Sequence, residues 1–468
     1  MTHHPQTPSG EPDRGWSRRR FIIQSVAGAA ALAGGGGLLA ACGGDDDDDA
    51  EPSTNPPTPP TSGSAVGAAT TAPAPGGTGA VSDVAIKIGW VTPITGPLAA
   101  FGEADSYVIQ SLRALLPNVE IVQKDAESDP GKAGEVTQEL INEGCHLIVA
   151  GDTPDITVPV ANQCTLGEVP CITSLAPWQP HYLGTGGTLG PDGPGGAASP
   201  FNFHFFWGLE DVIENFIALW EQSGADKVVG GMWPNDPDGN AWGDAAVGFP
   251  PALEAAGFTV VDAGRFELDT QDFSAIIGQF KEAGVQIVSG VVPPPVFANF
   301  QAAALQQDFQ PAVITMAKAL LFPSAVETYP KGEGLSSEIW WSAKHPFSSS
   351  LTGQSAAELA AAYEEATGTQ WTQPLGFAHA LVEVAVDVAT RAGSTDADAL
   401  LAAIAATKLD TVVGTVDFSN GPVAGITKTA LCAGQWVAGD DYPLELAITV
   451  NNHIDGLETD GTIQPIAY

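Results

Sequence analysis

The stretch Ile86-Lys-Ile-Gly-Trp-Val-Thr-Pro-Ile-Thr-Gly-Pro-Leu-Ala-Ala-Phe-Gly102 decides the fold of this chain. It begins as an apolar run and ends in a loop that is rich in proline and glycine. Apolar residues then recur at three- and four-residue spacings, as in a helix: Tyr107, Val108, Leu112, Leu115 and Leu116. This order predicts a strand, a loop and a helix, the first unit of a parallel sheet. Such sheets bind ligands at the carboxyl ends of their strands, so Gly96 and Gly102 are expected to let the loop backbone approach a ligand.

Strand and helix patterns alternate along the rest of the chain in two sets. The first set predicts strands at 84–91, 119–124, 145–150 and 170–175 and helices at 101–116, 130–143 and 155–166. The second set predicts strands at 201–207, 226–233, 258–263, 285–292 and 312–317 and helices at 209–222, 242–256, 271–283 and 296–308. Later patterns predict a strand near 338–342, helices at 354–366, 374–391 and 396–406, and strands around 412–418 and 427–437. The sequence therefore predicts an α/β protein whose two lobes face a common ligand.

The composition limits the classes of partner and of chemistry. The chain has 468 residues, 44% of them hydrophobic, which is enough for two lobes with sizeable cores. Its formal net charge is -38, from 55 acidic and 17 basic residues. No nucleic acid is expected as a partner, because binding phosphates requires a basic face. No enzyme is expected either, because the chain has no GxSxG, HExxH or GxxxxGKS/T motif.

Two motifs near the N-terminus predict export and anchoring. Ser17-Arg-Arg-Arg-Phe-Ile-Ile23 is a twin-arginine pattern, and the Ala/Gly run after it ends in Leu39-Ala-Ala-Cys42. The second motif resembles a bacterial lipobox, in which a signal peptidase cuts before the cysteine and the thiol carries lipid. Residues 1–41 are therefore expected to be removed, and Cys42 to anchor the protein to the outer face of the cell membrane. A short transmembrane anchor is the alternative, which the many glycines of the run disfavour.

A low-complexity segment follows the expected lipid anchor. It contains five consecutive aspartates, Asp45 to Asp49, and is otherwise rich in Pro, Thr, Ser, Gly and Ala. Such a composition cannot build a core, so residues 42–83 are predicted to form a lipidated, disordered tether. Its root-mean-square reach of roughly 35 Å would hold a globular body away from a membrane.

Several motifs resemble those of one family. Ile86 to Gly102 and the turn Asp125-Ala-Glu-Ser-Asp-Pro130 are similar to features of the branched-chain amino-acid-binding (Leu/Ile/Val-binding) family. So are Gly151-Asp-Thr153, Trp242-Gly243 and Gln271-Asp-Phe-Ser274. These are the type I periplasmic solute-binding proteins of ABC transporters, and the resemblance covers residues 84 to about 450.

The resemblance implies both an architecture and a role. It implies two doubly wound parallel-sheet lobes joined by three crossings, with a ligand cleft between them. Lobe 1 is expected at 84–205 and 339–436, and lobe 2 at 206–338 and 437–468. The implied role is that of an extracytoplasmic receptor that binds a small molecule by lobe closure and delivers it to ABC permease subunits in the membrane. The alternative role is a receptor that signals to a membrane sensor.

The cysteines predict one disulfide, because the exported compartment is oxidising. Cys164 is expected to end a helix and Cys171 to begin the next strand, so the two can meet. Cys145 competes for the same partner, and Cys432 has no assigned partner. No metal and no cofactor are expected, because no CxxC motif or histidine pair accompanies the cysteines. Asp236-Pro-Asp-Gly-Asn240 resembles the start of a calcium loop but lacks its later ligands, so it is interpreted as an ordinary turn.

Candidate ligand-binding residues come from the ends of the expected strands. Thr153 and Asp155 precede a helix whose free N–H groups could bind an anion, although either residue could simply cap that helix. Trp178, Trp207 and Trp242 would cover an apolar or aromatic ligand, with core packing as the alternative for each. The full set of candidates is Thr95, Phe101, Thr153, Asp155, Ala176, Trp178, Trp207, Trp242, Pro294 and Lys318.

The chain departs from the family at the expected amino-acid clamp. Amino-acid binders hold the ligand carboxylate with small hydroxyl residues, and here Asp155 and Trp178 stand in those places. Lys318 stands where the family has an acidic residue for the ligand ammonium. We therefore expect a small organic acid or an amino-acid-like ligand, with Lys318 as its anion partner. A lysine that points to solvent, or one paired with a carboxylate such as Asp155, is the alternative. On the first interpretation, Lys318→Met weakens ligand binding and leaves the melting temperature of the empty protein nearly unchanged.

Overall fold

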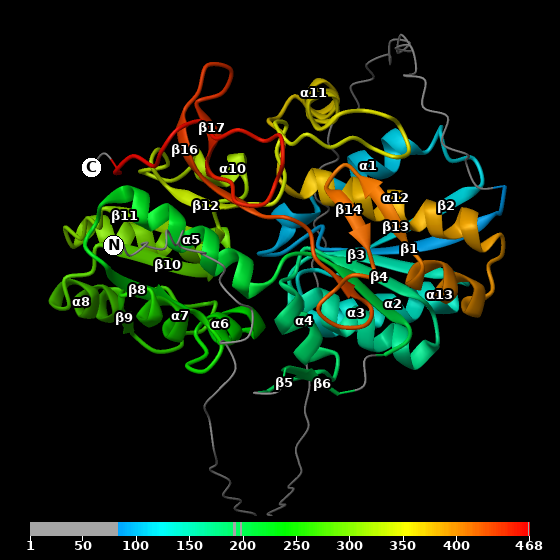
Figure 1. Cartoon of the computed structure of the whole chain (residues 1–468), viewed down its shortest axis with the longest axis horizontal. Coiled ribbons are helices and arrows are strands. Elements are labelled where there is room, and N and C mark those ends of the chain that lie inside the picture. The colour runs from blue at the N-terminus through cyan, green and yellow to red at the C-terminus, as the bar shows by residue number, and fades with distance from the viewer. Residues whose placement is uncertain (1–82, 191–192, 197–198, 467) are drawn as a thin grey trace, which may run out of the picture. The chain divides into compact units, whose positions relative to one another are not determined.

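The computed structural model describes residues 83–190, 193–196, 199–466 and 468 (Figure 1). The predicted signal peptide, the predicted lipidation site Cys42 and all of the predicted tether except Asp83 lie outside these residues. Within the described part of the chain, no helix is both long and apolar enough to cross a membrane.

The first lobe is built on a six-stranded parallel sheet that contains the opening stretch. The sheet order is β15-β7-β4-β3-β1-β2. Its strands are β1 (Ile86–Thr92), β2 (Val119–Asp125), β3 (Leu147–Gly151), β4 (Cys171–Ser174), β7 (Asn202–Phe205) and β15 (Ile426–Thr427). The central strands read as continuous apolar runs because helices cover both faces of the sheet. Because all six strands run parallel, their carboxyl ends meet along one edge of the sheet.

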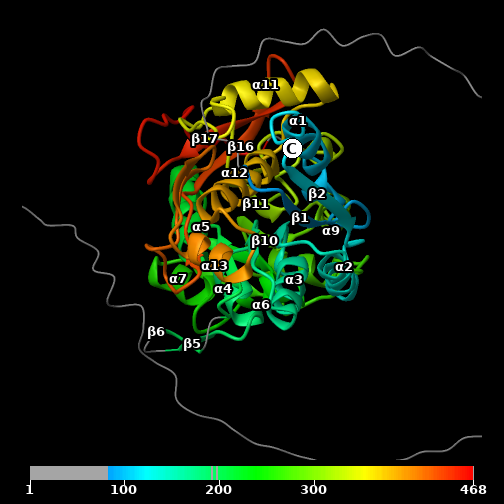
Figure 2. The ribbon, with the colours of Figure 1, turned by 90° about the vertical axis from the view of Figure 1, so that its right-hand side faces the viewer.

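Helices cover the two faces of the first sheet. On one face, α1 (Asp105–Leu112) packs against α12 (Pro374–Ala392), which contacts β3 and β4. On the other face, α2 (Pro130–Asn142) packs against α3 (Pro154–Gly167) (Figures 1 and 2). The remaining elements of this lobe are η1 (Ala99–Gly102), α4 (Trp178–Gly184), β5 (Thr188–Gly190), β6 (Gly193–Gly195), α11 (Ala356–Thr367), α13 (Ala397–Ala405), β13 (Lys408–Thr411) and β14 (Gly414–Asp417).

The second lobe is built on a seven-stranded sheet of order β17-β16-β12-β11-β10-β8-β9. Its parallel part consists of β8 (Val228–Met232), β9 (Thr259–Asp262), β10 (Ile287–Val292), β11 (Val313–Lys318) and β12 (Ser336–Ile339). Two strands, β16 (Cys432–Ala438) and β17 (Leu444–Val450), pair antiparallel at one edge. The helices are α5 (Leu209–Ser223), α6 (Pro237–Trp242), α7 (Phe249–Ala255), α8 (Ser274–Glu282), α9 (Pro294–Gln306) and α10 (Pro323–Val326).

The chain passes between the two sheets three times, after β7, after β12 and after β15. The two-lobed α/β fold with three crossings is thus confirmed. The boundary expected at 436/437 is displaced, because β16 already belongs to the second sheet, where Gln435 pairs with Ser336 of β12. The sequence predicts one strand at 427–437, whereas the structure has β15 in the first sheet and β16 in the second. An apolar run does not show which sheet its residues join.

Two predicted helices are interrupted. The segment expected to be helical at 101–116 contains η1 and the shorter α1. The segment expected to be helical at 242–256 breaks between α6 and α7, where the Asp244 side chain accepts hydrogen bonds from the N–H groups of Ala246 and Val247. An aspartate that bonds to nearby backbone N–H groups favours a turn over a continuous helix.

Gly102 serves a different purpose from the one expected. A Cβ atom at this position would lie 2.5 Å from Thr92 Oγ1 and 2.7 Å from the carbonyl oxygen of Pro93. The glycine therefore lets η1 pack directly on the end of β1. Gly96, with a φ of 90°, similarly lies against Ser128, where its Cβ would be 2.6 Å from the hydroxyl. Neither glycine lines the cavity between the lobes.

Candidate ligand-binding site

A cavity lies where the carboxyl ends of the two sheets face each other. The first lobe lines it through loops that follow β1, β3, β4 and β7. The second lobe lines it through α6, the ends of β10 and β11, and the end of β12. The lining residues are Phe101, Thr153, Leu175, Pro177, Trp207, Asp238, Trp242, Val291, Ala317, Lys318, Glu338 and Trp340.

Lys318 ends β11 and is bound to two carboxylates. Its Nζ lies 3.2 Å from Asp236 Oδ2 and 2.7 Å from Asp238 Oδ2, and only 7% of its side chain is exposed. Burial lowers the pKa of Lys318, but the attraction of Asp236 and Asp238 outweighs burial and raises it above its usual value. The structure thus shows a lysine already engaged by two aspartates, where the sequence predicted an amine free for a ligand anion. The expected alternative partner, Asp155, contributes a more distant attraction.

The two aspartates belong to the turn Asp236-Pro-Asp-Gly-Asn240, for which the sequence predicts no ligand contact. Asp236 is the N-cap of α6 and accepts a hydrogen bond from the N–H of Gly239 at 2.6 Å. Capping fixes the direction of the first turn of α6, so Asp238 points at Lys318. Burial raises the pKa of Asp238 to about 6, because the attraction of Lys318 offsets only part of the desolvation. The turn therefore builds a charged wall of the cavity.

Glu338 adds a third carboxyl group to this side of the site. It belongs to β12, and burial raises its pKa to about 7, although the Ser337 hydroxyl donates a hydrogen bond to its Oε2 at 2.7 Å. The cavity wall thus carries one lysine against the carboxyl groups of Asp236, Asp238 and Glu338. Acidic groups outnumber the cation on this wall.

Aromatic rings form the rest of the site and join the two lobes. Trp340 follows β12, and its ring centroid lies 6.1 Å from that of Phe101 and 6.4 Å from that of Trp207, both in the first lobe. Trp242 ends α6 and stacks on Phe249 with centroids 4.7 Å apart. These rings give the cavity a largely aromatic lining.

Five buried polar atoms of the lining have no hydrogen-bond partner among the described residues. They are Thr153 Oγ1, Asp238 Oδ1 and the indole Nε1 atoms of Trp207, Trp242 and Trp340. Buried polar groups are nearly always paired, and an unpaired one costs about 1–3 kcal/mol. Both lobes contribute such atoms to a single cavity. A polar ligand in this cavity would supply the missing hydrogen-bond partners.

Backbone strain is found on both sides of the cavity. Leu175 has a φ of 70° and Lys318 a φ of 64°, in the left-handed region that glycine favours. Such conformations cost roughly 1–3 kcal/mol and are concentrated at binding and catalytic sites. The two strained residues directly follow β4 and end β11, the strand ends where a ligand would lie.

The structure brings together five of the ten predicted residues in this lining, namely Phe101, Thr153, Trp207, Trp242 and Lys318. The other five lie outside it. The Thr95 hydroxyl donates to Asp125 at 2.7 Å and closes its own loop. The Ala176 carbonyl accepts a hydrogen bond from His204, and Pro294 begins α9.

Asp155 and Trp178 also lie outside the lining. Asp155 stands in the first turn of α3, and burial raises its pKa. The Trp178 indole donates to Glu210 at 3.3 Å and packs with Tyr182 and Ile426, away from the cavity. Side-chain direction in a short helix such as α4 depends on its packing, which the position after a strand does not reveal.

Sequence reasoning missed several lining residues that carry signals. Trp340 directly follows β12 but lies inside the strand that was expected at 338–342, so the strand-end argument would have selected it only with the boundaries that the structure shows. Asp238 belongs to the turn Asp236–Asn240, for which only a calcium loop and an ordinary turn were considered. Glu338 is an acidic residue within a buried strand, a pattern that commonly marks a functional site. Leu175 and Pro177 carry no comparable signal.

The cysteines of the described chain are thiols in the structure. Cys164 lies near the end of α3 and Cys171 begins β4, as expected. Burial and a hydrogen bond with Cys171 raise the pKa of the Cys164 thiol. The two are neighbours without being joined, so their disulfide stays a prediction. No group of three or more His, Cys, Asp or Glu residues in the described segments is placed to hold a metal ion.

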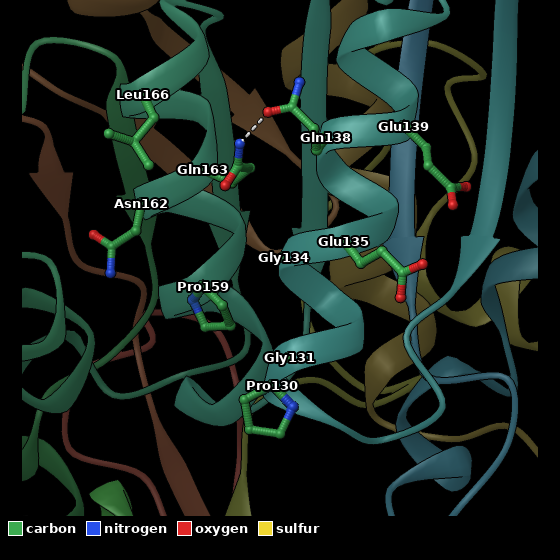
Figure 3. Close-up of a pocket in the computed structure, with 10 residues that line it drawn as sticks. All are labelled: Pro130, Gly131, Gly134, Glu135, Gln138, Glu139, Pro159, Asn162, Gln163 and Leu166. Carbon is green, nitrogen blue, oxygen red and sulfur yellow. Dashed lines mark hydrogen bonds between the residues drawn. The ribbon is translucent and has the colours of Figure 1, made fainter.

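A second, shallow groove runs between α2 and α3 on the outer face of the first lobe (Figure 3). Its two walls are bridged by a hydrogen bond from Gln163 to Gln138. Glu139 on its rim is paired with Lys124 at 2.7 Å, and Leu166 is 78% exposed. The groove holds no buried polar atom without a partner, so it lacks the feature that marks the cavity between the lobes.

The periplasmic binding protein family model matches residues 85–440. The chain belongs to the periplasmic binding protein family. The resemblance to type I periplasmic solute-binding proteins is thus confirmed, and so is the expectation that the chain is a solute-binding protein and not an enzyme.

Individual relatives agree with this assignment. The chain is 28% identical over 242 residues to Leu/Ile/Val-binding protein homolog 6 of Brucella abortus, a match that covers 48% of this chain and 55% of that protein. The chain thus spans about half the length of the curated relatives it matches.

Solved structures share the fold. A leucine-binding protein from Thermotoga maritima superposes with a TM-score of 0.64 at 19% identity, covering 78% of this chain and 99% of that one. A solute-binding protein of an ABC transporter from R. palustris, in complex with 4-hydroxybenzoate, superposes with a TM-score of 0.61 at 20% identity, covering 81% and 97%. At this level of identity they support the fold alone.

Proposed function

We propose that this chain is the extracytoplasmic, lipid-anchored receptor of an ABC importer and that its lobes close on an amino-acid-like ligand or a small organic acid. The observation that carries the proposal is the single cavity to which both lobes contribute unpartnered polar atoms. Thr153 and Trp207 supply donors from the first lobe, and Asp238 supplies an acceptor from the second. A ligand that pairs these atoms stabilises the closed arrangement, which permease subunits in the membrane would recognise.

The geometry suggests how each end of such a ligand is held. The Thr153 hydroxyl and the indole N–H groups of Trp207 and Trp242 are available to a ligand carboxylate. Lys318 has three N–H donors and uses two of them on Asp236 and Asp238. Its charge is therefore largely compensated, and its remaining N–H could only supplement the Thr153 and indole donors. The rings of Phe101 and Trp340 would enclose the apolar part.

Ligand identification tests this proposal. The full-length chain, purified from its native host without refolding, is denatured and its released small molecules are analysed by mass spectrometry. We expect one small amino-acid-like compound or organic acid in a near-stoichiometric amount, and the same compound should raise the melting temperature when added back. If no compound co-purifies and none from an amino-acid and organic-acid panel binds, the receptor function is wrong.

The anchor is tested separately from the cavity. We propose that residues 1–41 are removed and that Cys42 carries lipid. Intact mass spectrometry of the protein from host membranes should show the lipid on Cys42, and Cys42→Ala should leave the protein unprocessed or released. An unmodified Cys42 in the native protein would contradict the anchor without affecting the receptor function.

The disulfide between Cys164 and Cys171 is also part of the proposal. Oxidation of these neighbouring thiols would close a short loop and stabilise the exported protein by about 2–3 kcal/mol. Peptide mapping without reductant should recover the two cysteines in one linked pair. Free thiols at both positions in the exported protein, or a link between Cys145 and Cys171, would contradict it.

A further inference from the structure

The charge of the cavity wall disfavours a ligand that is purely anionic. Lys318 is bound to Asp236 and Asp238, and Glu338 adds a carboxyl group on the neighbouring strand. Asp238 uses its Oδ2 for Lys318 and leaves Oδ1 without a partner. A negatively charged ligand group at this wall would lie beside carboxylates whose charge Lys318 only partly compensates, in a medium of low polarity. A positive group on the ligand would instead compensate them.

Aromatic rings stand beside these carboxylates. Phe101, Trp207, Trp242 and Trp340 line one cavity, and Trp340 lies within 6.4 Å of both first-lobe rings, centroid to centroid. The face of an aromatic ring attracts a cation, most strongly for tryptophan and in a site without water. Several rings and two acidic residues in the lining of one cavity are the components of a cage for a cation.

The hydrogen-bonding groups of the wall identify the kind of cation. A primary ammonium carries three N–H donors and requires acceptors for them. The unpartnered lining atoms among the described residues are three indole N–H donors, the Thr153 hydroxyl, which can donate or accept, and Asp238 Oδ1 as the one carboxylate oxygen. An ammonium whose hydrogens are replaced by methyl groups requires no acceptors. It gains from ring faces and from nearby negative charge.

We infer that the ligand carries a methylated ammonium group, held in a cage formed by Phe101, Trp207, Trp242 and Trp340 with Asp238 and Glu338 as its counter-charges. The donors of Thr153 and of the indoles would then take a carboxylate at the other end. Such a ligand belongs to the betaine class of zwitterions. The inference rests on the proposed function, since it names the substrate class of the same cavity.

A methylation series on the unaltered full-length chain tests the inference. Affinities for glycine, N-methylglycine, N,N-dimethylglycine and glycine betaine are measured by calorimetry, with tetramethylammonium chloride as a probe of the cage alone. We expect the affinity to rise along the series, by tenfold or more between glycine and glycine betaine, which is about 1.4 kcal/mol. Tetramethylammonium should bind weakly and should compete with glycine betaine.

Two variants separate the cage from general tryptophan effects. Trp340→Leu should weaken glycine betaine at least tenfold, and Trp340→Phe, which keeps a ring in case the first variant fails to fold, should weaken it less. Trp371→Leu is the matched control, because Trp371 packs edge-on against Trp341 and does not line the cavity. It should leave the affinity for glycine betaine unchanged.

The outcomes distinguish this inference from the proposed function. If glycine betaine and tetramethylammonium fail to bind while a primary amino acid or an organic acid co-purifies, the methylated-ammonium inference is overturned and the receptor function stands. Tighter binding of glycine than of glycine betaine overturns it equally. If no small molecule co-purifies or binds at all, both are overturned.

Discussion

Replacing Lys318 by methionine tests the central electrostatic feature of the site. The Lys318 side chain is 7% exposed, and those of its partners Asp236 and Asp238 are 4% and 2% exposed. Methionine fills a similar volume without charge, so the substitution leaves two buried carboxylates without a cation. Breaking a buried ion pair by removing one partner costs about 3–5 kcal/mol. We therefore expect Lys318→Met to destabilise the empty protein strongly, the reverse of the near-neutral effect that the sequence predicted.

The cost should depend on pH in a defined direction. Burial already raises the pKa of Asp238 to about 6 with Lys318 present, and loss of the lysine raises it further. When the pKa of a carboxyl group is higher in the folded protein than in the unfolded chain, its protonated form stabilises the fold. This stabilisation is lost as pH rises through the folded pKa. The destabilisation by Lys318→Met should therefore be about 3 kcal/mol or more at pH 8 and clearly smaller at pH 5. Asp238→Asn in the same chain should restore part of the loss.

The assay is urea unfolding of the empty full-length chain, followed by far-UV circular dichroism at both pH values. Lys124→Met is the matched control, because Lys124 also lies 2.7 Å from two carboxylates, Glu139 and Glu143, but the side chains of these partners are 44% and 42% exposed. An exposed pair of this kind contributes about 1 kcal/mol or less. If the two variants lose equal stability, or if Lys318→Met is within about 0.5 kcal/mol of the parent at pH 8, the reasoning is wrong.

Two further predictions concern positions away from the ligand. Burial lowers the pKa of His181 to about 4, so its neutral form is the folded one, and the stability it contributes above pH 6.5 is lost as pH falls towards 4. Thermal unfolding between pH 7 and pH 4.5 should thus show about 2–3 kcal/mol less acid destabilisation in His181→Gln; parallel curves would contradict this. Gly102→Ala places a Cβ 2.5 Å from Thr92 Oγ1 and should cost about 1–3 kcal/mol in urea unfolding, whereas Gly134→Ala, with open space around its Cβ, should be neutral or stabilising. Equal effects of the two substitutions would contradict the packing role of Gly102.

The elements of the fold were predictable because each has a local signal. The strand expected at 119–124 is β2 (Val119–Asp125), and the helix expected at 374–391 is α12 (Pro374–Ala392). In both, apolar periodicity is bounded by a turn or by a proline at the first helical position. The same local signals could not place β16, because its partner Ser336 in β12 lies about a hundred residues earlier in the chain.

The candidate site was predictable to the extent that topology determines it. Strand ends of a parallel sheet meet at one edge, which is why Phe101, Thr153 and Trp207 line one cavity although they come from separate units. Side-chain direction was not available from that argument. Trp178 follows β4, as Pro177 does, but its ring turns towards Glu210 and Tyr182.

The chemistry of the site depended on a pairing that no local pattern reveals. Lys318 was recognised as a rare cation in an apolar strand, and the turn Asp236-Pro-Asp238 was recognised as acidic, but 82 residues separate Lys318 from Asp236. β8 and β11 pair in parallel with opposite sides of β10, so their carboxyl ends lie at the same edge of the sheet. Lys318 ends β11 and the acidic turn follows β8, which brings the lysine and the aspartates together. Once joined, the lysine compensates the aspartates, and its charge is no longer free to select an anion. What remains for selectivity is the unpaired Asp238 oxygen, the indole N–H donors and the ring faces, and these favour a ligand that carries both charges over one that carries only a carboxylate.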